Sequence, residues 1–242
     1  MNSFFNQADT PARGIARGID RATFDAGLRS HMLRVYNFMG LGLALTGAVA
    51  LAVANIPALF NLIFGTPLAF VAMLAPLGFL FFFSAKLHSA TASSVQTMFW
   101  VFCGLMGLSM ASIFVAFAGA DVARAFFITG AMFGATSLWG YTTRRDLTGM
   151  GAFMMMGVLG LVIAGLVNLF LQSSALQWAV SVASVFIFTG LTAWDTQRIK
   201  EQYAEGYGVE ANTKLAVMGA LSLYLNFINL FQAILALTGR RE

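Results

Sequence analysis

The sequence predicts an all-α integral membrane protein with seven transmembrane helices. Apolar residues make up 59% of the 242 residues and charged residues only 10%, whereas a soluble domain has roughly 25% charged residues. The mean hydropathy is +0.78. Seven apolar stretches are close to the roughly 20 residues that a helix needs to cross a bilayer. Because a membrane accepts apolar side chains on the outside of a helix as well as the inside, lipid is the solvent that fits this composition.

The seven stretches follow one another with short polar or glycine-containing breaks between them. The break before the fourth stretch is short and contains Gly119 and Asp121. In chain order the stretches are Leu33–Ala54, Pro67–Ala85, Met98–Ala118, Val122–Tyr141, Met150–Leu171, Leu176–Trp194 and Leu215–Leu237. We therefore divide the chain into a cytoplasmic, partly disordered tail at residues 1–32 and a seven-helix transmembrane domain at residues 33–239.

Basic residues lie at the ends of the apolar stretches, and Lys and Arg in short loops favour the cytoplasmic side. If the N-terminus is cytoplasmic, eleven of the 14 basic residues fall on that side: five in or near the tail and Lys86, Arg144, Arg145, Arg198, Lys200 and Lys214. The other side receives Arg124, Arg240 and Arg241. This imbalance predicts a cytoplasmic N-terminus, and seven crossings put the C-terminus outside. A re-entrant last segment, which would keep Arg240 in the cytoplasm, stays open.

The residue inventory excludes several functions. The formal charge of +4 does not predict nucleic-acid binding, because the basic residues form no stripe. The single cysteine, Cys103, excludes an intramolecular disulfide. Only His31 and His88 are available as bases or metal ligands, and there is no HExxH motif. We expect neither an enzyme nor a cofactor, and the partners that remain are the bilayer, calcium or protons, and other membrane proteins.

Asp195 follows an apolar run and is the only carboxylate that we place inside the membrane. Ionisable residues there are costly and are functional candidates by default. The alternative is a helix-end carboxylate paired with Arg198 one turn further on. Since an unpaired carboxylate next to hydrocarbon is expensive, we expect it to have a partner. The candidate charge partners are Lys86, Arg144 and Arg198, and Asn226 is a candidate hydrogen-bond donor.

Asn226 lies near the middle of the last apolar stretch. Ser222 at i−4 and Asn229 at i+3 place a polar stripe on the same helix face. The stripe could belong to a functional site, or it could supply hydrogen bonds that hold the bundle together, worth about 1 kcal/mol each. The residue pattern alone favours this second role.

Glycines recur in pairs within the apolar stretches, as in Gly40 with Gly42, Gly104 with Gly107, and Gly157 with Gly160. Small residues at such positions let helix backbones approach in a membrane. The equally weighted alternative is that glycine is simply common in membrane helices.

Three blocks of the sequence stand out by their pattern. They are GYTTRRDLTGMG at Gly140–Gly151, FTGLTAWDTQRIK at Phe188–Lys200 and ALSLYLNFINLF at Ala220–Phe231. In order and spacing these blocks resemble the Bax inhibitor-1 family, in its bacterial YccA-like branch, and the resemblance covers the chain from about Phe24. The N-terminal piece Gly27–Tyr36 is similar to the family's entry into its first helix.

The resemblance implies a fold in which the last helix is central and the other six surround it. It also implies a location in the bacterial inner membrane and a pH-sensitive calcium leak, controlled by two aspartates that share a proton near the cytoplasmic mouth. One of these aspartates maps to Asp195. The other maps to Asn226, so the second carboxylate is absent here. Two adjacent carboxylates titrate as a pair, which an Asp with an Asn cannot do, and calcium prefers several anionic oxygen ligands. We therefore assign no residues of this chain as metal ligands.

Two functions follow from these observations. The first is a pH-sensitive cation leak or an ion-sensing protein, with Asp195 and Asn226 in the gate region. The alternative is a non-conducting protein that modulates other membrane proteins, such as a membrane protease. A hydrated cavity next to Asp195 with a closable constriction favours conduction, whereas a dry, fully packed bundle favours the alternative.

Overall fold

The computed structural model describes residues 11–87, 89–204 and 208–240, with side chains described from Phe24 onward. Over these ranges the chain is all α-helical, and seven helices are long and apolar enough to cross a membrane. The helices are α1 (Pro11–Asn55), α2 (Pro57–Phe64), α3 (Leu68–Lys86), α4 (Ala92–Ala116), α5 (Gly119–Thr142), α6 (Thr148–Leu171), α7 (Ser174–Gln202) and α8 (Gly208–Thr238). The predicted fold class is confirmed.

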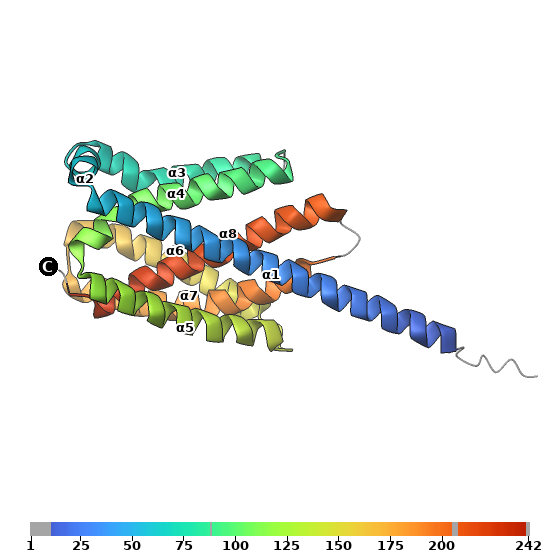
Figure 1. Ribbon diagram of the computed structural model, residues 1–242. Coiled ribbons are helices and arrows are strands. Elements are labelled where there is room, and N and C mark those ends of the chain that lie inside the picture. Colours follow the sequence, from blue (N-terminus) through green and yellow to red (C-terminus); the bar gives the residue numbers. More distant parts are fainter. Residues whose placement is uncertain (1–10, 88, 205–207, 241–242) are drawn as a thin grey trace, which may run out of the picture.

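The long helices lie side by side in one bundle and alternate in direction (Figure 1). The connections that follow α3, α5 and α7 lie at the same end as the N-terminal part of α1, which projects beyond the other helices. The helix α8 ends at the opposite end of the bundle, where the short helix α2 also lies. Lys86, Arg144 and Arg145 are therefore at the end that carries the N-terminal part of α1. Which end faces the cytoplasm stays a prediction.

Several helices are longer than the apolar stretches that predicted them. The helix α1 begins at Pro11 instead of Leu33, and α7 continues past Trp194 to Gln202. In contrast, α4 ends at Ala116, two residues before the predicted end. Apolarity marks the part of a helix that lies in lipid, whereas backbone hydrogen bonding continues into polar residues. Residues 1–10, Arg241 and Glu242 lie outside the described residues, so disorder in the tail stays a prediction.

The last helix is the most buried of the seven. In α8, 67% of the most apolar window is buried, whereas in every other span the figure is 33% or less. It packs against α1, α4, α5 and α7, while α3 packs mainly on α4 and α6 mainly on α7. The expectation that all six other spans surround α8 is therefore not confirmed.

The glycine pairs divide into positions that are packed and positions that are open. A Cβ atom on Gly42 would lie 2.9 Å from Cys103 Sγ, and one on Gly107 would lie 2.6 Å from the Thr46 carbonyl oxygen. These two glycines allow the close contact between α1 and α4, as small residues do in membranes. In the third pair Gly157 is the packed member, since its Cβ would lie 2.8 Å from Ile187 Cδ1. The other member of each pair has nothing within 4 Å of an added Cβ: Gly40, Gly104 and Gly160.

Candidate functional site

The carboxylate of Asp195 is buried between α7 and α8. The residue is 4% exposed, and Asn226, on the facing helix, is 5% exposed. The Asn226 side-chain amide donates a hydrogen bond of 2.7 Å to Oδ2 of Asp195. On the other oxygen, Oδ1, the guanidinium of Arg198 forms an ion pair at 2.9 Å. Both carboxylate oxygens therefore have a partner, one from each of the two helices.

Arg198 lies one turn beyond Asp195 on α7 and links several groups. Its guanidinium donates a hydrogen bond of 3.3 Å to Ser222 Oγ on α8. It also lies over the Trp194 ring, 4.7 Å from the centroid, which is within the range of a cation–π interaction. Ser222 and Asn226 are two members of the predicted polar stripe. Its third member, Asn229, donates to the Leu225 carbonyl of its own helix and does not join the site.

A cavity of about 240 Å³ adjoins the site. It lies between α3, α7 and α8 and is lined in part by Ser84, Gln202, Arg198 and Ser222. Since Arg198 and Ser222 belong both to the cavity wall and to the Asp195 cluster, they separate the carboxylate from the cavity. On the other side of Asn226, α8 continues with fully buried side chains such as Leu230. The site thus stands between a cavity and a closely packed core.

The block from Gly140 to Gly151 fits against the segment that carries Asp195. A Cβ atom on Gly140 would lie 2.2 Å from the Ala193 carbonyl oxygen, and one on Gly151 would lie 2.3 Å from the Trp194 ring. Only glycine allows these two approaches. The two residues that precede Asp195 on α7 are therefore held by α5 and α6.

Gln197 fixes the connection between α5 and α6. Its amide nitrogen donates to the Arg145 carbonyl at 2.8 Å, and its amide oxygen accepts the Leu147 N–H at 2.8 Å. One helical turn from Thr196, Lys200 donates to the Tyr141 carbonyl at 2.8 Å. The three sequence blocks therefore meet at one place, and most of their polar residues position α7.

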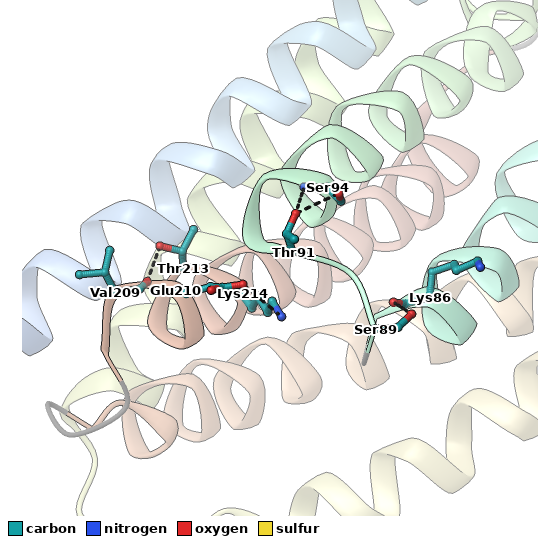
Figure 2. Close-up of polar contacts among 8 residues, drawn as sticks. All are labelled: Lys86, Ser89, Thr91, Ser94, Val209, Glu210, Thr213 and Lys214. Atoms are coloured by element: carbon teal, nitrogen blue, oxygen red, sulfur yellow. Dashed lines mark hydrogen bonds and ion pairs between the residues drawn. The ribbon is translucent and has the colours of Figure 1, made fainter.

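The candidate charge partners have different places in the structure. Arg198 contacts Asp195, whereas no ion pair joins Asp195 to Lys86 or Arg144 among the described residues. Arg144 is exposed in the connection between α5 and α6. Lys86 ends α3, where its carbonyl accepts a hydrogen bond from Ser89 Oγ (Figure 2). Neither the end of α3 nor the connection between α5 and α6 brings a cation to the carboxylate.

Local contacts organise this end of the bundle. Figure 2 shows Thr91 accepting the Ser94 N–H at the start of α4, and Lys214 paired with Glu210 in the first turns of α8. The Oγ1 atom of Thr213, which donates to the Val209 carbonyl, also accepts from Arg34 of α1 at 3.1 Å. These contacts fix the ends of α4 and α8 without touching Asp195.

Sequence reasoning missed a second buried carboxylate, at the opposite end of the bundle. Asp121, in the first turn of α5, is 9% exposed. It pairs with Arg124 at 3.2 Å and accepts the backbone N–H of Arg240 at 2.9 Å. The available signal was the spacing of Asp121 three positions before Arg124 at a helix start. Because the break before α5 is short, the sequence did not clearly indicate that a helix starts there.

A polar chain between α1, α5 and α7 was also missed. The Tyr36 hydroxyl bonds to Ser137 Oγ at 2.7 Å, and Ser137 Oγ bonds to Thr196 Oγ1 at 2.9 Å. Single hydroxyl groups within or just after an apolar stretch give no sequence signal. Within the described residues there is no cluster of three or more His, Cys, Asp or Glu side chains that could hold a metal ion.

The seven apolar helices and the buried polar cluster between the last two define an integral membrane protein with a charged site inside its bundle. The family model described as "Inhibitor of apoptosis-promoting Bax1" matches residues 28–242. This chain belongs to the Bax inhibitor-1 family.

Bacterial proteins are similar to this chain over most of their length. An uncharacterized protein of Rickettsia prowazekii is 45% identical over 91% of this chain and 93% of its own. A protein of Caulobacter vibrioides is 44% identical over 94% and 96%. The inner membrane protein YbhL of Escherichia coli K12 is 40% identical over 90% and 94%.

Proposed function

We propose that this protein is a pH-sensitive cation leak in a bacterial inner membrane, with Asp195 as its gating carboxylate. Calcium is the candidate ion, as the family resemblance implies. The observation that carries the proposal is the place of the Asp195 carboxylate between a cavity and a packed core. Buried ionisable groups in transmembrane segments often mark ion and proton pathways.

The contacts of Asp195 correspond to a closed gate. Arg198 and Asn226 tie its two oxygens, so the carboxylate joins α7 to α8. A cation in the cavity meets the guanidinium of Arg198 first, and like charge opposes its entry. Arg198 must move aside before the cation can reach Asp195.

Protonation of Asp195 is the event that opens this gate. A neutral carboxyl group attracts the Arg198 guanidinium less strongly, so the link between α7 and α8 weakens. Because a single carboxylate supplies few of the anionic oxygens that calcium prefers, we expect the leak to be slow near neutral pH. Flux should increase as the pH falls.

A liposome assay tests the gate directly. Purified protein is reconstituted around a calcium-sensitive dye, and flux is measured between pH 5 and pH 8 for the parent and for Asp195→Asn. The variant cannot ionise at this position, so its flux should be high and should not depend on pH. Asp121→Asn, which removes the carboxylate at the other end of the bundle, should keep the parent's profile. Identical flux and pH dependence in the parent and Asp195→Asn would overturn the proposal.

The orientation is part of the proposal, because a cytoplasmic N-terminus makes the cavity open toward the cytoplasm. An Asn2→Cys variant with Cys103→Ala tests it. An impermeant thiol reagent should leave this site unlabelled in intact cells and should label it in inverted vesicles. Labelling in intact cells would reverse the orientation.

A second candidate, a non-conducting protein that modulates a membrane protease or another membrane protein, is favoured by one observation. The most apolar window of α6 has no buried residue, and α6 packs mainly on α7. Its outer face, which includes Met156 and Leu159, is free for contact with another membrane helix. Absence of flux at every pH, together with crosslinking of this face to a second protein, would favour this function.

A further inference from the structure

A long groove lies between α1 and α5 on the outside of the bundle. Its central part has a volume of about 670 Å³, and its part toward the α5–α6 connection has a volume of about 640 Å³. The two parts adjoin, since Tyr36 lines one and Gly40, one turn further along α1, lines the other. Leu33 and Phe127, which also line the groove, are exposed, so it opens toward lipid.

The glycines that line this groove face open space. On α1, an added Cβ at Gly40 or Gly47 would meet nothing within 4 Å, and the same is true of Gly130 and Gly134 on α5. The packed glycine Gly42 of α1 faces α4 instead. Small residues thus line both walls of a space that none of the described helices fills.

The floor of the groove is apolar and belongs to α8. Phe227 and Phe231 line its central part, and Phe126 of α5 packs edge-on against both rings. Phe227 directly follows Asn226 in the sequence. A molecule in the groove would therefore contact the buried helix beside the candidate gate.

Among the described residues that line the groove, those with a charge lie at one end. Asp25 and Arg29 are exposed, lie four residues apart on one face of α1, and form no ion pair with another described residue. Moving outward from the apolar part, Arg29 comes first and Asp25 lies about 6 Å further along the helix axis. The order from the membrane centre is thus apolar wall, positive charge and negative charge.

We propose that this groove binds one phospholipid with a phosphoethanolamine headgroup. Such a lipid has the complementary order of acyl chain, anionic phosphate and cationic ammonium. The phosphate binds Arg29, the primary ammonium binds Asp25, and an acyl chain lies along the open glycines. A membrane helix would fill the apolar part but would leave both charges without partners.

Native mass spectrometry of the full chain in mild detergent tests this proposal. After removal of lipid, the protein is titrated with dioleoyl phosphatidylethanolamine, the matching phosphatidylcholine and the matching phosphatidylglycerol. We expect one retained phosphatidylethanolamine per chain and weaker retention of the other two lipids. Phosphatidylcholine has no ammonium hydrogen to donate to Asp25, and phosphatidylglycerol has no ammonium group.

Two sets of variants separate the groove from general lipid contact. Gly47→Leu combined with Gly130→Leu fills the space and should abolish the retained lipid. Gly160→Leu, at an equally open glycine on α6, should not. Arg29→Gln and Asp25→Asn should each weaken retention about two- to five-fold, as expected for an exposed ion pair. Arg144→Gln removes a charge at the same end and should leave retention unchanged.

Two results would overturn the proposal. One is equal retention of phosphatidylethanolamine by the parent and by a folded, monodisperse filled variant. The other is a parent dimer that the filled variant loses while the lipid stays bound, which would assign the groove to a second copy. If the filled variant does not fold, exchange of the two charges by Asp25→Arg with Arg29→Asp provides the test, because both sites are exposed. The preference for phosphatidylethanolamine over phosphatidylglycerol should disappear in this variant, and an unchanged preference would refute the proposed headgroup contacts.

Discussion

Two Asp–Arg pairs with the same i,i+3 spacing lie at opposite ends of the bundle and have different surroundings. Asp121 and Arg124 begin α5, and the Arg124 side chain is 62% exposed. Asp195 and Arg198 lie within α7, where Arg198 is 40% exposed and the Asp195 side chain only 6%. The first carboxylate accepts a backbone N–H from the end of the chain, and the second accepts the side-chain amide of Asn226.

The difference shows that one local pattern can serve two purposes. Near the start of α5, a negative charge is favoured by the helix dipole, so Asp121 is stable there with few other partners. In the interior of α7 no such field is available, and Asp195 depends on Arg198 and Asn226. Asp121 fastens the C-terminal residues to the bundle, whereas Asp195 joins two transmembrane helices.

The largest effect should come from Asn226→Asp, which places a second carboxylate next to Asp195. The pair shares a proton at low pH and repels once both groups ionise, so α7 and α8 should separate as the pH rises. We expect the calcium flux of this variant to increase on the order of ten-fold from pH 5 to pH 8, whereas the flux of the parent should decrease over the same range. A ten-fold change corresponds to about 1.36 kcal/mol of repulsion between the two carboxylates.

The liposome assay measures this change, and Asn229→Asp is the matched control. It adds the same charge to α8 at a side chain that bonds only within its own helix, so it should not create this profile. Adding Asp195→Asn to Asn226→Asp breaks the carboxylate pair and should remove the increase of flux with rising pH. A folded Asn226→Asp protein with the parent's flux at every pH would show that a pair of carboxylates does not gate this chain.

The next largest effect compares the two carboxylates by stability. Asp195→Ala leaves the Arg198 guanidinium and the Asn226 amide without their acceptor, which should lower the free energy of unfolding by about 2–3 kcal/mol. Asp121→Ala removes a helix-start charge and one hydrogen bond, and it should cost about 1 kcal/mol. Unfolding in mixed micelles measures both, and equal losses would remove the distinction between the two pairs.

A smaller effect should come from the packing that positions Asp195. Gly151→Ala places a Cβ 2.3 Å from the Trp194 ring, and the resulting shift of α6 or α7 should cost about 2 kcal/mol. Gly149→Ala, two residues earlier on α6, meets nothing within 4 Å and should be neutral or slightly stabilising. Thermal unfolding of the two variants tests this, and a neutral Gly151→Ala would mean that Trp194 does not depend on this contact.

The sequence predicted the parts of this molecule that rest on local pattern. Seven apolar stretches indicated the seven spans, because each span must contact lipid or the core along its whole length. Arg198 was a foreseeable partner of Asp195, since residues three apart share a helix face. Lys86 and Arg144 carry the same charge as Arg198 and were predicted on the same side of the membrane, so these two properties could not separate the three candidates. Lys86 and Arg144 lie in or beside loops, and the sequence does not determine where such loops place a side chain.

Contacts between distant residues needed other information. The pairing of Asp195 with Asn226 came from the family resemblance, since the depth of a residue in one helix does not fix its neighbour in another. The bond between Asp121 and the backbone of Arg240 joins residues 119 positions apart, and no pattern in either segment indicates it. The predicted stretch ended at Trp194, whereas α7 continues to Gln202, because polar residues end an apolar run without ending a helix.

The smallest effect on stability should come from a third carboxylate, Asp146, which is not buried between helices. Asp146 is exposed, and one of its oxygens accepts the Thr148 N–H at 2.8 Å at the start of α6. Hydrogen bonds from Thr148 lower its pKa below the ordinary value of 3.8.

Because the folded pKa of Asp146 is lowered, the ionised group stabilises the fold above its unfolded pKa, and this contribution is lost as the pH falls through the folded pKa. Asp146→Asn keeps an acceptor but removes the charge, so it should lower the unfolding midpoint slightly at pH 7 and not at all at a pH below the folded pKa. The difference in midpoint between parent and variant, measured across this range in mixed micelles, should therefore shrink as the solution becomes more acidic. A difference of constant size would show that the charge of Asp146 does not support the start of α6, and would leave burial between helices as the condition under which a carboxylate matters in this protein.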